Sequence, residues 1–200
     1  MSPPQIVNSI KKGVNLNPLN EFEVKNLLKH NRINIPKSSL VSTDKVMEAA
    51  EKIGYPLVLK AVLPEIHHKS DISGVNLNLK NVSELKDALS KMSELSDTFL
   101  VEEMITGCVA ELILGMNEDK QFGLSLILGA GGIFTELLND SVVLMMPLSK
   151  KNVKESISKL RVNKLLSGWR GQPEGDSEEL VETVMSFEKF IRSNIESLVE

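Results

Sequence analysis

The 200-residue sequence predicts an α+β fold, in which helices and mostly antiparallel strands share a core. Two observations support this class. Apolar residues recur at helical spacing near both ends of the chain, most clearly in the C-terminal run that contains Leu180, Val184 and Ile191. Between these helices, short apolar or alternating runs follow one another like the strands of hairpins. A strictly alternating order of strand and helix, typical of a parallel sheet, is not found.

The composition excludes several classes of protein. A formal net charge of −4 argues against a nucleic acid as the main partner, because phosphate neutralisation needs a basic face. No apolar run is long enough to span a bilayer, and the start MSPPQIVNSIKKG lacks the features of a signal peptide. The single cysteine, Cys108, excludes an internal disulfide and is expected to be a half-buried structural thiol rather than a nucleophile. The sequence therefore predicts a cytoplasmic protein without a nucleic-acid or membrane partner.

The N-terminal part combines a polar leader with one capped helix. Residues 1–17 are polar and contain prolines and a glycine, which is typical of a flexible leader. Asn20 and Glu23 fit a capping box, in which each side chain accepts a hydrogen bond from the other residue's N–H. Val24 and Leu27 then begin an apolar stripe. A helix is expected to start at Asn20.

The next segment predicts a helix followed by a buried strand. Ser42 is expected to cap the helix, which Gly54 ends in the position that favours a positive φ, and Pro56 prevents its continuation. Residues 57–62 form a short apolar run that is interrupted only by Lys60. A buried strand with one lysine is therefore expected.

The rest of the chain alternates strands with helices. Residues 75–79 alternate apolar with polar side chains, as in a half-buried strand. Ser83 is expected to cap a helix that runs to about Leu95. Two helices are expected to close the chain. Further strands are expected at 99–104, 110–116, 122–128 and 142–146.

Two loops carry the residues most suited to chemistry. The loop at 64–75 holds two histidines, a lysine, a serine, an aspartate and a glycine, and the loop at 128–140 holds three glycines. Glycine-rich turns let backbone N–H groups surround phosphate oxygens, and lysine supplies a compensating charge. Neutral imidazole is nucleophilic near pH 7 and can carry a phosphoryl group. Together the loops contain the parts of a phosphoryl-transfer site.

Each of these features also has a structural interpretation. Glycine pairs most often mark turns, and neither a Walker nor a Rossmann spacing is present. Adjacent histidines are usually surface residues. A lysine inside an apolar strand is costly unless its ammonium reaches a partner or a ligand. Lys60 could equally lie on the wet face of an edge strand, and the pattern leaves both interpretations open.

The order of several motifs resembles a known family. The stretches IGYPLVLKAV, HKSDISGVNLNL, FLVEEMITG, AELILGMNEDKQFG, LGAGGIFTELLND, PLS and LLSGWRGQPEGD occur in family order from about residue 20 to the C-terminus. They resemble the ATP-grasp domain of ADP-forming (NDP-forming) acyl-CoA synthetases, of the acetyl-CoA synthetase β-subunit type. The succinyl-CoA synthetase β subunit is similar more distantly. The resemblance implies an ATP-grasp fold of two α+β lobes with the nucleotide between them. It covers residues 18–200, with a smaller nucleotide lobe at about 40–105.

The resemblance implies that a phosphohistidine passes phosphate to and from ADP/ATP, during acyl-CoA + ADP + phosphate = acid + CoA + ATP. It carries the relay to His68, whereas His67 stands where the family is usually apolar. ATP/ADP and Mg2+ are the implied cofactors, and a CoA-binding α subunit or domain is the implied partner. The implied nucleotide-binding residues are Lys60, Lys69, Ser70, Asp71, Ser73, Gly74, Glu102, Glu103 and Glu111, with Gly131, Gly132 and the catalytic Glu136 in the phosphohistidine loop.

Three departures from the family pattern leave alternatives open. Ser73 replaces the first of two glycines, and SVVLMMPL lacks the usual arginine before its proline. The family continues past the last helix into a strand whose Asp-x-Asn-Pro motif supplies magnesium ligands. That strand would begin beyond Glu200, so the metal ligands are unknown and the domain is expected to be incomplete. The alternatives are a truncated chain, a split protein, a degenerate nucleotide-binding module and a detached acyltransferase domain.

Overall fold

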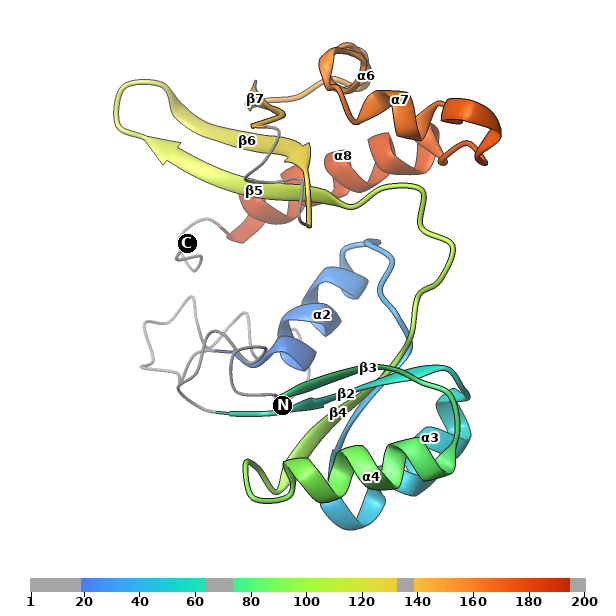
Figure 1. The fold of residues 1–200 in the computed structure, drawn as a ribbon. Helices are drawn as coiled ribbons and strands as arrows, with labels where there is room; N and C mark the ends of the chain where they lie inside the picture. The colour runs from blue at the N-terminus through green and yellow to red at the C-terminus, as the bar shows by residue number, and fades with distance from the viewer. Residues whose placement is uncertain (1–18, 64–73, 133–138, 195–200) are drawn as a thin grey trace. The chain divides into compact units, whose positions relative to one another are not determined.

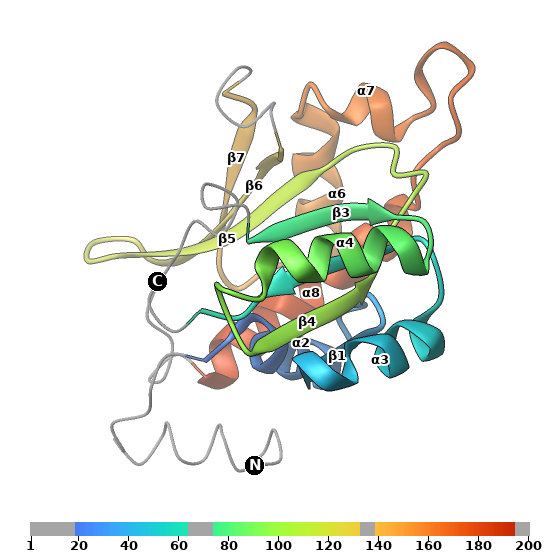
Figure 2. The same cartoon turned by 60° about the horizontal axis from the view of Figure 1, so that its bottom comes forward.

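The computed structural model describes residues 19–63, 74–132 and 139–194, which form two compact units. The first unit contains Asn17–Leu27 and Ile35–Thr106, and the second contains Leu28–Asn34 and the chain from Gly107 onward. Each unit combines an antiparallel sheet with helices (Figures 1 and 2). The predicted α+β class is therefore confirmed.

The first unit is built on a four-stranded sheet in the order β1-β4-β2-β3. Every neighbouring pair in it is antiparallel. Helices α3 and α4 lie on the same face of this sheet (Figure 1). The elements are α2 (Glu21–His30), β1 (Ser38–Ser42), the 3-10 turn η1 (Thr43–Lys45), α3 (Val46–Ile53), β2 (Leu57–Ala61), β3 (Val75–Leu79), α4 (Val82–Met92) and β4 (Thr98–Glu103). The last residues of α2, from Leu28 onward, belong to the second unit.

The pleat of β2 divides its side chains between two faces. Leu57, Leu59 and Ala61 are buried in a core with residues of α3 and α4. Successive side chains of a strand point to opposite faces, so Val58 and Lys60 point away from that core. The N-terminal turns of α2 meet this second face, where Lys60 contacts Glu21. The charged face is therefore separate from the main core.

The second unit is built on a three-stranded antiparallel sheet in the order β5-β6-β7. Leu126, Leu128 and Leu144 are buried on one face, and α6 packs on β7 and on α8. The strand register places Ile113, Ile127, Val143 and Met145 on the opposite face. The elements are β5 (Leu112–Asp119), β6 (Gly123–Ala130), β7 (Ser141–Met145), α6 (Lys150–Lys159), α7 (Asn163–Leu166), the 3-10 turn η2 (Trp169–Gly171) and α8 (Ser177–Asn194).

The helix ends confirm one predicted cap and correct two others. The Asn20 N–H donates to Glu23 Oε2 at 2.9 Å, and the Glu23 N–H donates to Asn20 Oδ1 at 3.0 Å, which is the predicted capping box. Ser42 makes no cap bond, because the turn η1 lies between it and α3. The Ser42 hydroxyl donates to the Asp44 carboxylate instead. Ser83 lies inside α4, whose cap is Asn81. Asn81, two residues before Ser83, is the N-cap because its side chain accepts a hydrogen bond from the Glu84 N–H.

Three further predictions are corrected. The strand β1 was not expected, since SSLVS is short and polar and is held by pairing with the distant β4. A third helix, α7, stands between the two that were expected after β7. Cys108 is exposed rather than half-buried. Within the described ranges, no helix is both long and apolar enough to cross a membrane.

Replacing Asn20 with alanine is expected to lower the free energy of unfolding by about 1 kcal/mol, because the Glu23 N–H loses its acceptor. For a chain of this size that corresponds to a melting temperature lower by roughly 2–4 °C. Thermal unfolding followed by circular dichroism measures it. Asn20→Ser is the matched control, because serine caps about as well as asparagine. A loss of the same size in both variants would show that the capping box does not stabilise α2.

Candidate functional site

Lys60 lies on an interior strand, so the interpretation of a wet edge strand is wrong. β2 is bonded on one side to β4 and on the other to β3. Only 17% of the Lys60 side chain is exposed. Its ammonium must therefore be compensated by groups on the same face of the sheet.

Two carboxylates supply that compensation. Lys60 Nζ lies 2.6 Å from Glu21 Oε1 and 3.0 Å from Glu102 Oε1. Lys25 Nζ lies 2.9 Å from Glu21 Oε1 and also contacts Glu102 Oε2. The Glu102 side chain is only 6% exposed. We call these four residues the Lys60 network; their formal charges cancel.

The network shifts the pKa of two of its members. Burial alone would raise the pKa of Glu21, but hydrogen bonds and charge from Lys60 and Lys25 outweigh it and lower that pKa. Burial alone would likewise lower the pKa of Lys60, but the two carboxylates outweigh it and raise that pKa. Glu21 therefore contributes stability that is present above its unfolded pKa and is lost as the pH falls through its lower folded value. Lys60 stays charged at neutral pH.

The end of β4 is fixed by backbone bonds to neighbouring segments. The Glu103 N–H donates to Lys37 O at 2.8 Å, and Glu103 Oε2 accepts the Lys37 N–H at 3.2 Å. The Met104 N–H donates to Pro56 O at 3.1 Å. Next to β2, the buried Gly74 accepts the Ala61 N–H through its carbonyl oxygen at 2.9 Å. The first unit thus brings Glu102 into contact with Lys60. Glu103 lies at the end of β4, and Gly74 lies beside the end of β2.

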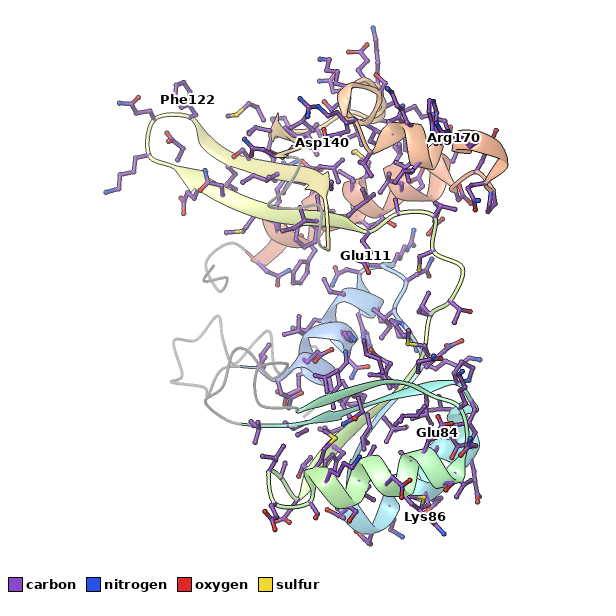
Figure 3. All side chains as sticks on the ribbon, in the orientation of Figure 1. Glu84, Lys86, Glu111, Phe122, Asp140 and Arg170 are labelled. Atoms are coloured by element: carbon purple, nitrogen blue, oxygen red, sulfur yellow. The ribbon has the colours of Figure 1, made fainter. Side chains whose placement is uncertain are left out.

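The second unit brings Glu111 to Gly131 and Gly132, just before β5 and after β6. The Gly131 N–H donates to Glu111 O at 2.8 Å. Gly132 has a φ of +59°, and a Cβ there would lie 1.8 Å from Glu111 Oε2. Figure 3 shows Glu111 where the chain enters β5. The glycine at 132 thus leaves room for a carboxylate.

The ends of this loop are anchored through Asp140. The Ala130 N–H donates to Asp140 O at 2.9 Å, and the Asp140 carboxylate accepts the N–H groups of Arg161 and Val162 at 2.8 Å each. A Cβ on Gly129 would lie 2.5 Å from Asp140 O, so only glycine fits beside this turn. Neighbouring backbone therefore lies close to this segment on both sides, at Asp140 beside Gly129 and at Leu112 beside Gly131.

Replacing Gly131 with alanine is expected to destabilise the second unit by about 1–3 kcal/mol, as overpacking does. A Cβ at 131 would lie 2.8 Å from the backbone carbon of Leu112, which cannot move without disturbing β5. Gly115→Ala is the matched control, since a Cβ there meets nothing within 4 Å. Equal unfolding free energies for the two variants in urea titrations would contradict the close approach.

Several candidate residues fall outside the described ranges. These are His68, Lys69, Ser70, Asp71, Ser73 and Glu136. Among the residues that the structure describes, no three His, Cys, Asp or Glu side chains gather as a metal site would require. The sequence prediction missed Glu21 and Lys25. Their spacing of four on a helix was a visible signal of an ion pair, but their contact with β2 and β4 depends on the fold.

Known proteins resemble this chain over nearly all of its length. Residues 12–198 match the family described as the ATP-grasp domain. The β subunit of acetate–CoA ligase [ADP-forming] II from Pyrococcus furiosus is 33% identical over 180 residues, covering 86% of this chain and 76% of that protein. The 4-hydroxybutyrate–CoA ligase [ADP-forming] of Nitrosopumilus maritimus is 34% identical over 94% of this chain, which spans 28% of that longer protein.

Solved structures agree with these relatives. PH1788 from Pyrococcus horikoshii superposes with a TM-score of 0.83 at 30% identity, covering 96% of this chain and 84% of that one. The dinucleotide-forming acetyl-coenzyme A synthetase 1 of Ca. Korarchaeum cryptofilum, solved with coenzyme A and Mg-AMPPCP, gives 0.81 at 29% identity over 98% and 86% of the two chains. The predicted ATP-grasp fold is confirmed. The chain therefore belongs to the ATP-grasp domain family, and within it to the group formed by the ATP-grasp parts of ADP-forming acyl-CoA synthetases.

Proposed function

We propose that this chain binds ADP or ATP and passes phosphate between the nucleotide and His68, as the ATP-grasp part of an ADP-forming acyl-CoA synthetase. The overall reaction would be acyl-CoA + ADP + phosphate = acid + CoA + ATP. The observation that carries the proposal is Lys60, a mostly buried ammonium on an interior strand that is kept charged by two carboxylates. A phosphate group is a natural ligand for such a cation.

The Lys60 network allows a nucleotide phosphate to replace Glu21 and Glu102 as the partner of Lys60. When phosphate oxygens take over the Lys60 ammonium, Glu102 still has Lys25 as a counter-ion. No carboxylate in the network is then left buried and unpaired, which would cost several kcal/mol. Lys25 would thus keep Glu102 compensated while Lys60 changes partners.

The second unit offers a different kind of surface. The face of its sheet with Ile113, Val143 and Met145 is apolar and exposed, and Glu111 stands at its edge. Apolar surface with a few placed polar groups is typical of sites for small organic ligands. We assign Glu111 to the ribose or base of the nucleotide, and Gly131 and Gly132 to the loop that presents the phosphohistidine. The domain would extend over 18–200, with the nucleotide lobe at about 40–105.

Magnesium would neutralise charge on the phosphates when it is bound. No described group of carboxylates fits it, so none of the residues above is assigned to the metal. A CoA-binding α subunit or domain would supply acyl and CoA recognition. The name of the Pyrococcus furiosus β subunit and the solved complex with coenzyme A and Mg-AMPPCP support the proposed partner, nucleotide and metal.

A second candidate function is a nucleotide-binding module without turnover. The segment 141–148 favours it, because it carries no positive charge and Leu144 within it is buried in the core. Both candidates predict nucleotide binding, and only the first predicts a phosphorylated histidine. The distinction therefore rests on phosphate transfer rather than on affinity.

Calorimetric titration of the 200-residue chain with ADP and ATP tests the shared part of both candidates. Binding is expected, and it should strengthen when Mg2+ is added, because the metal screens the phosphates. Addition of the nucleoside adenosine is the matched control, since it lacks the groups that Lys60 would bind. Equal affinity for adenosine and ADP would contradict the assignment of Lys60 to the phosphates.

A further inference from the structure

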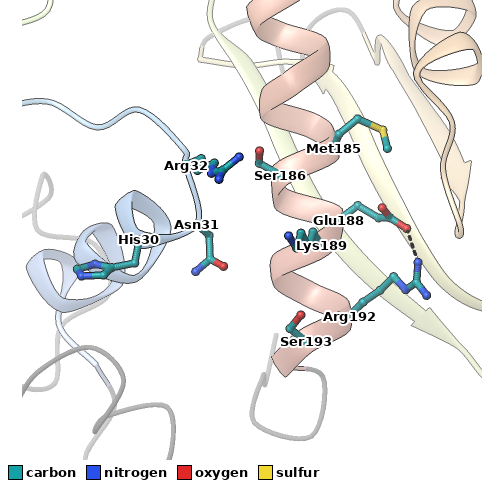
Figure 4. A pocket seen from close by; sticks show the side chains of 9 residues that line it. All are labelled: His30, Asn31, Arg32, Met185, Ser186, Glu188, Lys189, Arg192 and Ser193. Atoms are coloured by element: carbon teal, nitrogen blue, oxygen red, sulfur yellow. Dashed lines mark hydrogen bonds and ion pairs between the residues drawn. The ribbon is translucent and has the colours of Figure 1, made fainter.

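The second unit contains a cavity that the proposed function does not use. Residues 30–32, at the C-terminal end of α2, and residues of α8 line a space of about 830 Å3 (Figure 4). The lining side chains include Arg32, Ser186, Lys189 and Ser193. All of them belong to the second unit, whereas Lys60 belongs to the first. The cavity is therefore a separate site from the Lys60 network.

The spacing of the α8 residues puts polar groups on one stripe. Ser186, Lys189 and Ser193 are related by steps of three and four residues, so they share a face of the helix. Figure 4 shows the Arg32 guanidinium directed toward Ser186, with Asn31 beside it. The groups that line this space thus include the cations of Arg32 and Lys189, two hydroxyls and one amide, together with His30 and the Glu188–Arg192 pair. The two cations, the hydroxyls and the amide can each donate a hydrogen bond to an anion.

The positive charge of this cavity is not neutralised from within. Neither Arg32 nor Lys189 has an ion pair in the part of the chain that the structure describes. Glu188 lines the cavity too, but its Oε1 accepts the Leu148 N–H at 3.3 Å and faces Arg192 at 3.5 Å. Figure 4 shows this pair on the opposite side of α8 from Arg32. Among the described residues, the exposed side chains of Arg32 and Lys189 thus face one cavity without an ion pair, in a chain whose net charge is −4.

The backbone of Arg32 adds a second, independent observation. The Ile33 N–H donates to Leu28 O at 3.1 Å and the Arg32 N–H to Lys29 O at 3.0 Å, the bond pattern of a Schellman motif. Arg32 therefore holds the left-handed position of that motif, with a φ of 65°. Glycine adopts this conformation at lower energy and is the usual residue there. An arginine at this position sacrifices stability and places a guanidinium at the cavity.

We propose that this cavity is an anion site for a phosphate-bearing small molecule. Arg32 and Lys189 would supply the charge, and Ser186, Ser193 and Asn31 would donate hydrogen bonds to the phosphate oxygens. The volume of about 830 Å3 leaves room for more than one phosphate group. Pyrophosphate is the simplest probe of that chemistry, and ADP tests whether a nucleoside adds affinity.

The test is a calorimetric titration of the full chain carrying Lys60→Met, which removes the cation of the other proposed phosphate site. Pyrophosphate is expected to bind this chain. Adding Arg32→Gly should weaken binding by about tenfold or more, the usual effect of losing a charge-assisted hydrogen bond. The same substitution should raise the melting temperature, because glycine relieves the left-handed backbone. A purely structural arginine would change only the melting temperature.

Two further variants complete the design. Lys189→Ala should weaken pyrophosphate binding by a similar factor. Lys151→Ala removes an equal charge from a residue of α6 that does not line the cavity, and it should change binding less than about twofold. The proposal is overturned if the Lys60→Met chain does not bind pyrophosphate, if Arg32→Gly and Lys189→Ala bind it unchanged, or if Lys151→Ala weakens binding equally. Should Lys60→Met not fold, the wild-type chain with Arg32→Gly, Lys189→Ala and Lys151→Ala gives the same comparison.

Because the nucleotide site and this cavity use different residues, their failures can be told apart. Loss of ADP binding in Lys60→Met with retained pyrophosphate binding supports both sites. Pyrophosphate binding that disappears with Lys60→Met and ignores Arg32→Gly belongs to the nucleotide site alone, and this result overturns the cavity proposal. Tighter binding of ADP than of pyrophosphate by the Lys60→Met chain supports the cavity site and identifies its ligand as a nucleotide when Arg32→Gly and Lys189→Ala weaken that ADP binding too; ADP binding that ignores both changes belongs to the nucleotide site.

Discussion

A His68→Ala chain incubated with Mg2+ and ATP labelled on its γ-phosphate is expected to incorporate no phosphate, whereas the wild-type chain becomes labelled. The reason is chemical: imidazole is the nucleophile that accepts the phosphoryl group, and alanine offers no substitute. The label should be lost on mild acid treatment and kept in base, as expected for a phosphohistidine. Scintillation counting of the precipitated chain before and after acid measures it.

His67→Ala is the matched control, because it removes the neighbouring imidazole from the same loop. That variant should incorporate phosphate at a rate similar to the wild type. Equal labelling of His68→Ala and wild type would contradict the relay role. Labelling lost in His67→Ala alone would move the role to the other histidine. A wild-type chain that binds ATP but is never labelled would favour the module without turnover.

The order of the motifs predicted the ATP-grasp fold, whereas the local patterns predicted only individual helices and strands. Residues 75–79 could be assigned from alternation alone, and the Asn20–Glu23 capping box from its spacing, because both signals are local. β1 could not be assigned from its own residues. SSLVS has no strong alternation, and its stability comes from register with β4, about 60 residues away. Long-range pairing is what single-segment reasoning lacks.

The candidate site was only partly visible in the sequence. A lysine inside an apolar strand needs a partner, which makes Lys60 a candidate site residue. The pattern alone did not decide between a bound ligand and a position on an exposed edge strand. The strand order excluded the edge, and the contacts identified Glu21 and Glu102 as partners. Glu21 lies 39 residues from Lys60, so no local pattern could have paired them. The cap at Asn81 was missed for the opposite reason, since two adequate capping residues stood close together.

Arg32 was overlooked because its signal is a backbone angle rather than a residue pattern. A glycine after a helix is an easy marker of a position with positive φ, as at Gly54. An arginine at that position has no such marker, and its φ of 65° emerges only with the bonds to Leu28 and Lys29. Strained positions of this kind are where local propensity and fold disagree, and such positions are common at binding sites.

Lys60→Met is expected to weaken ADP binding by about tenfold to a hundredfold, because a charge-assisted hydrogen bond to phosphate is lost. The same change should lower the free energy of unfolding by about 1–3 kcal/mol, since Glu102 is nearly buried and would keep only Lys25 as a counter-ion. Methionine fills much of the space of the lysine stem, so the loss reports charge rather than packing. Calorimetry with ADP and urea unfolding measure the two effects.

Glu21→Gln is the variant that separates binding from stability. It keeps the shape of the side chain and leaves the contact between Lys60 and Glu102, and the removed carboxylate is about one third exposed. The unfolding free energy at pH 7 should therefore fall by less than about 1 kcal/mol. That difference should shrink as the pH falls below the ordinary carboxyl range and through the lowered pKa of Glu21. Protonated Glu21 no longer carries the charge that pairs with Lys60 and Lys25, so its contribution to stability is lost. ADP affinity should stay equal or rise, since Lys60 has one fewer internal partner. If Glu21→Gln weakened ADP binding as much as Lys60→Met, the network would be a structural unit, and the phosphate contact would have to be sought elsewhere.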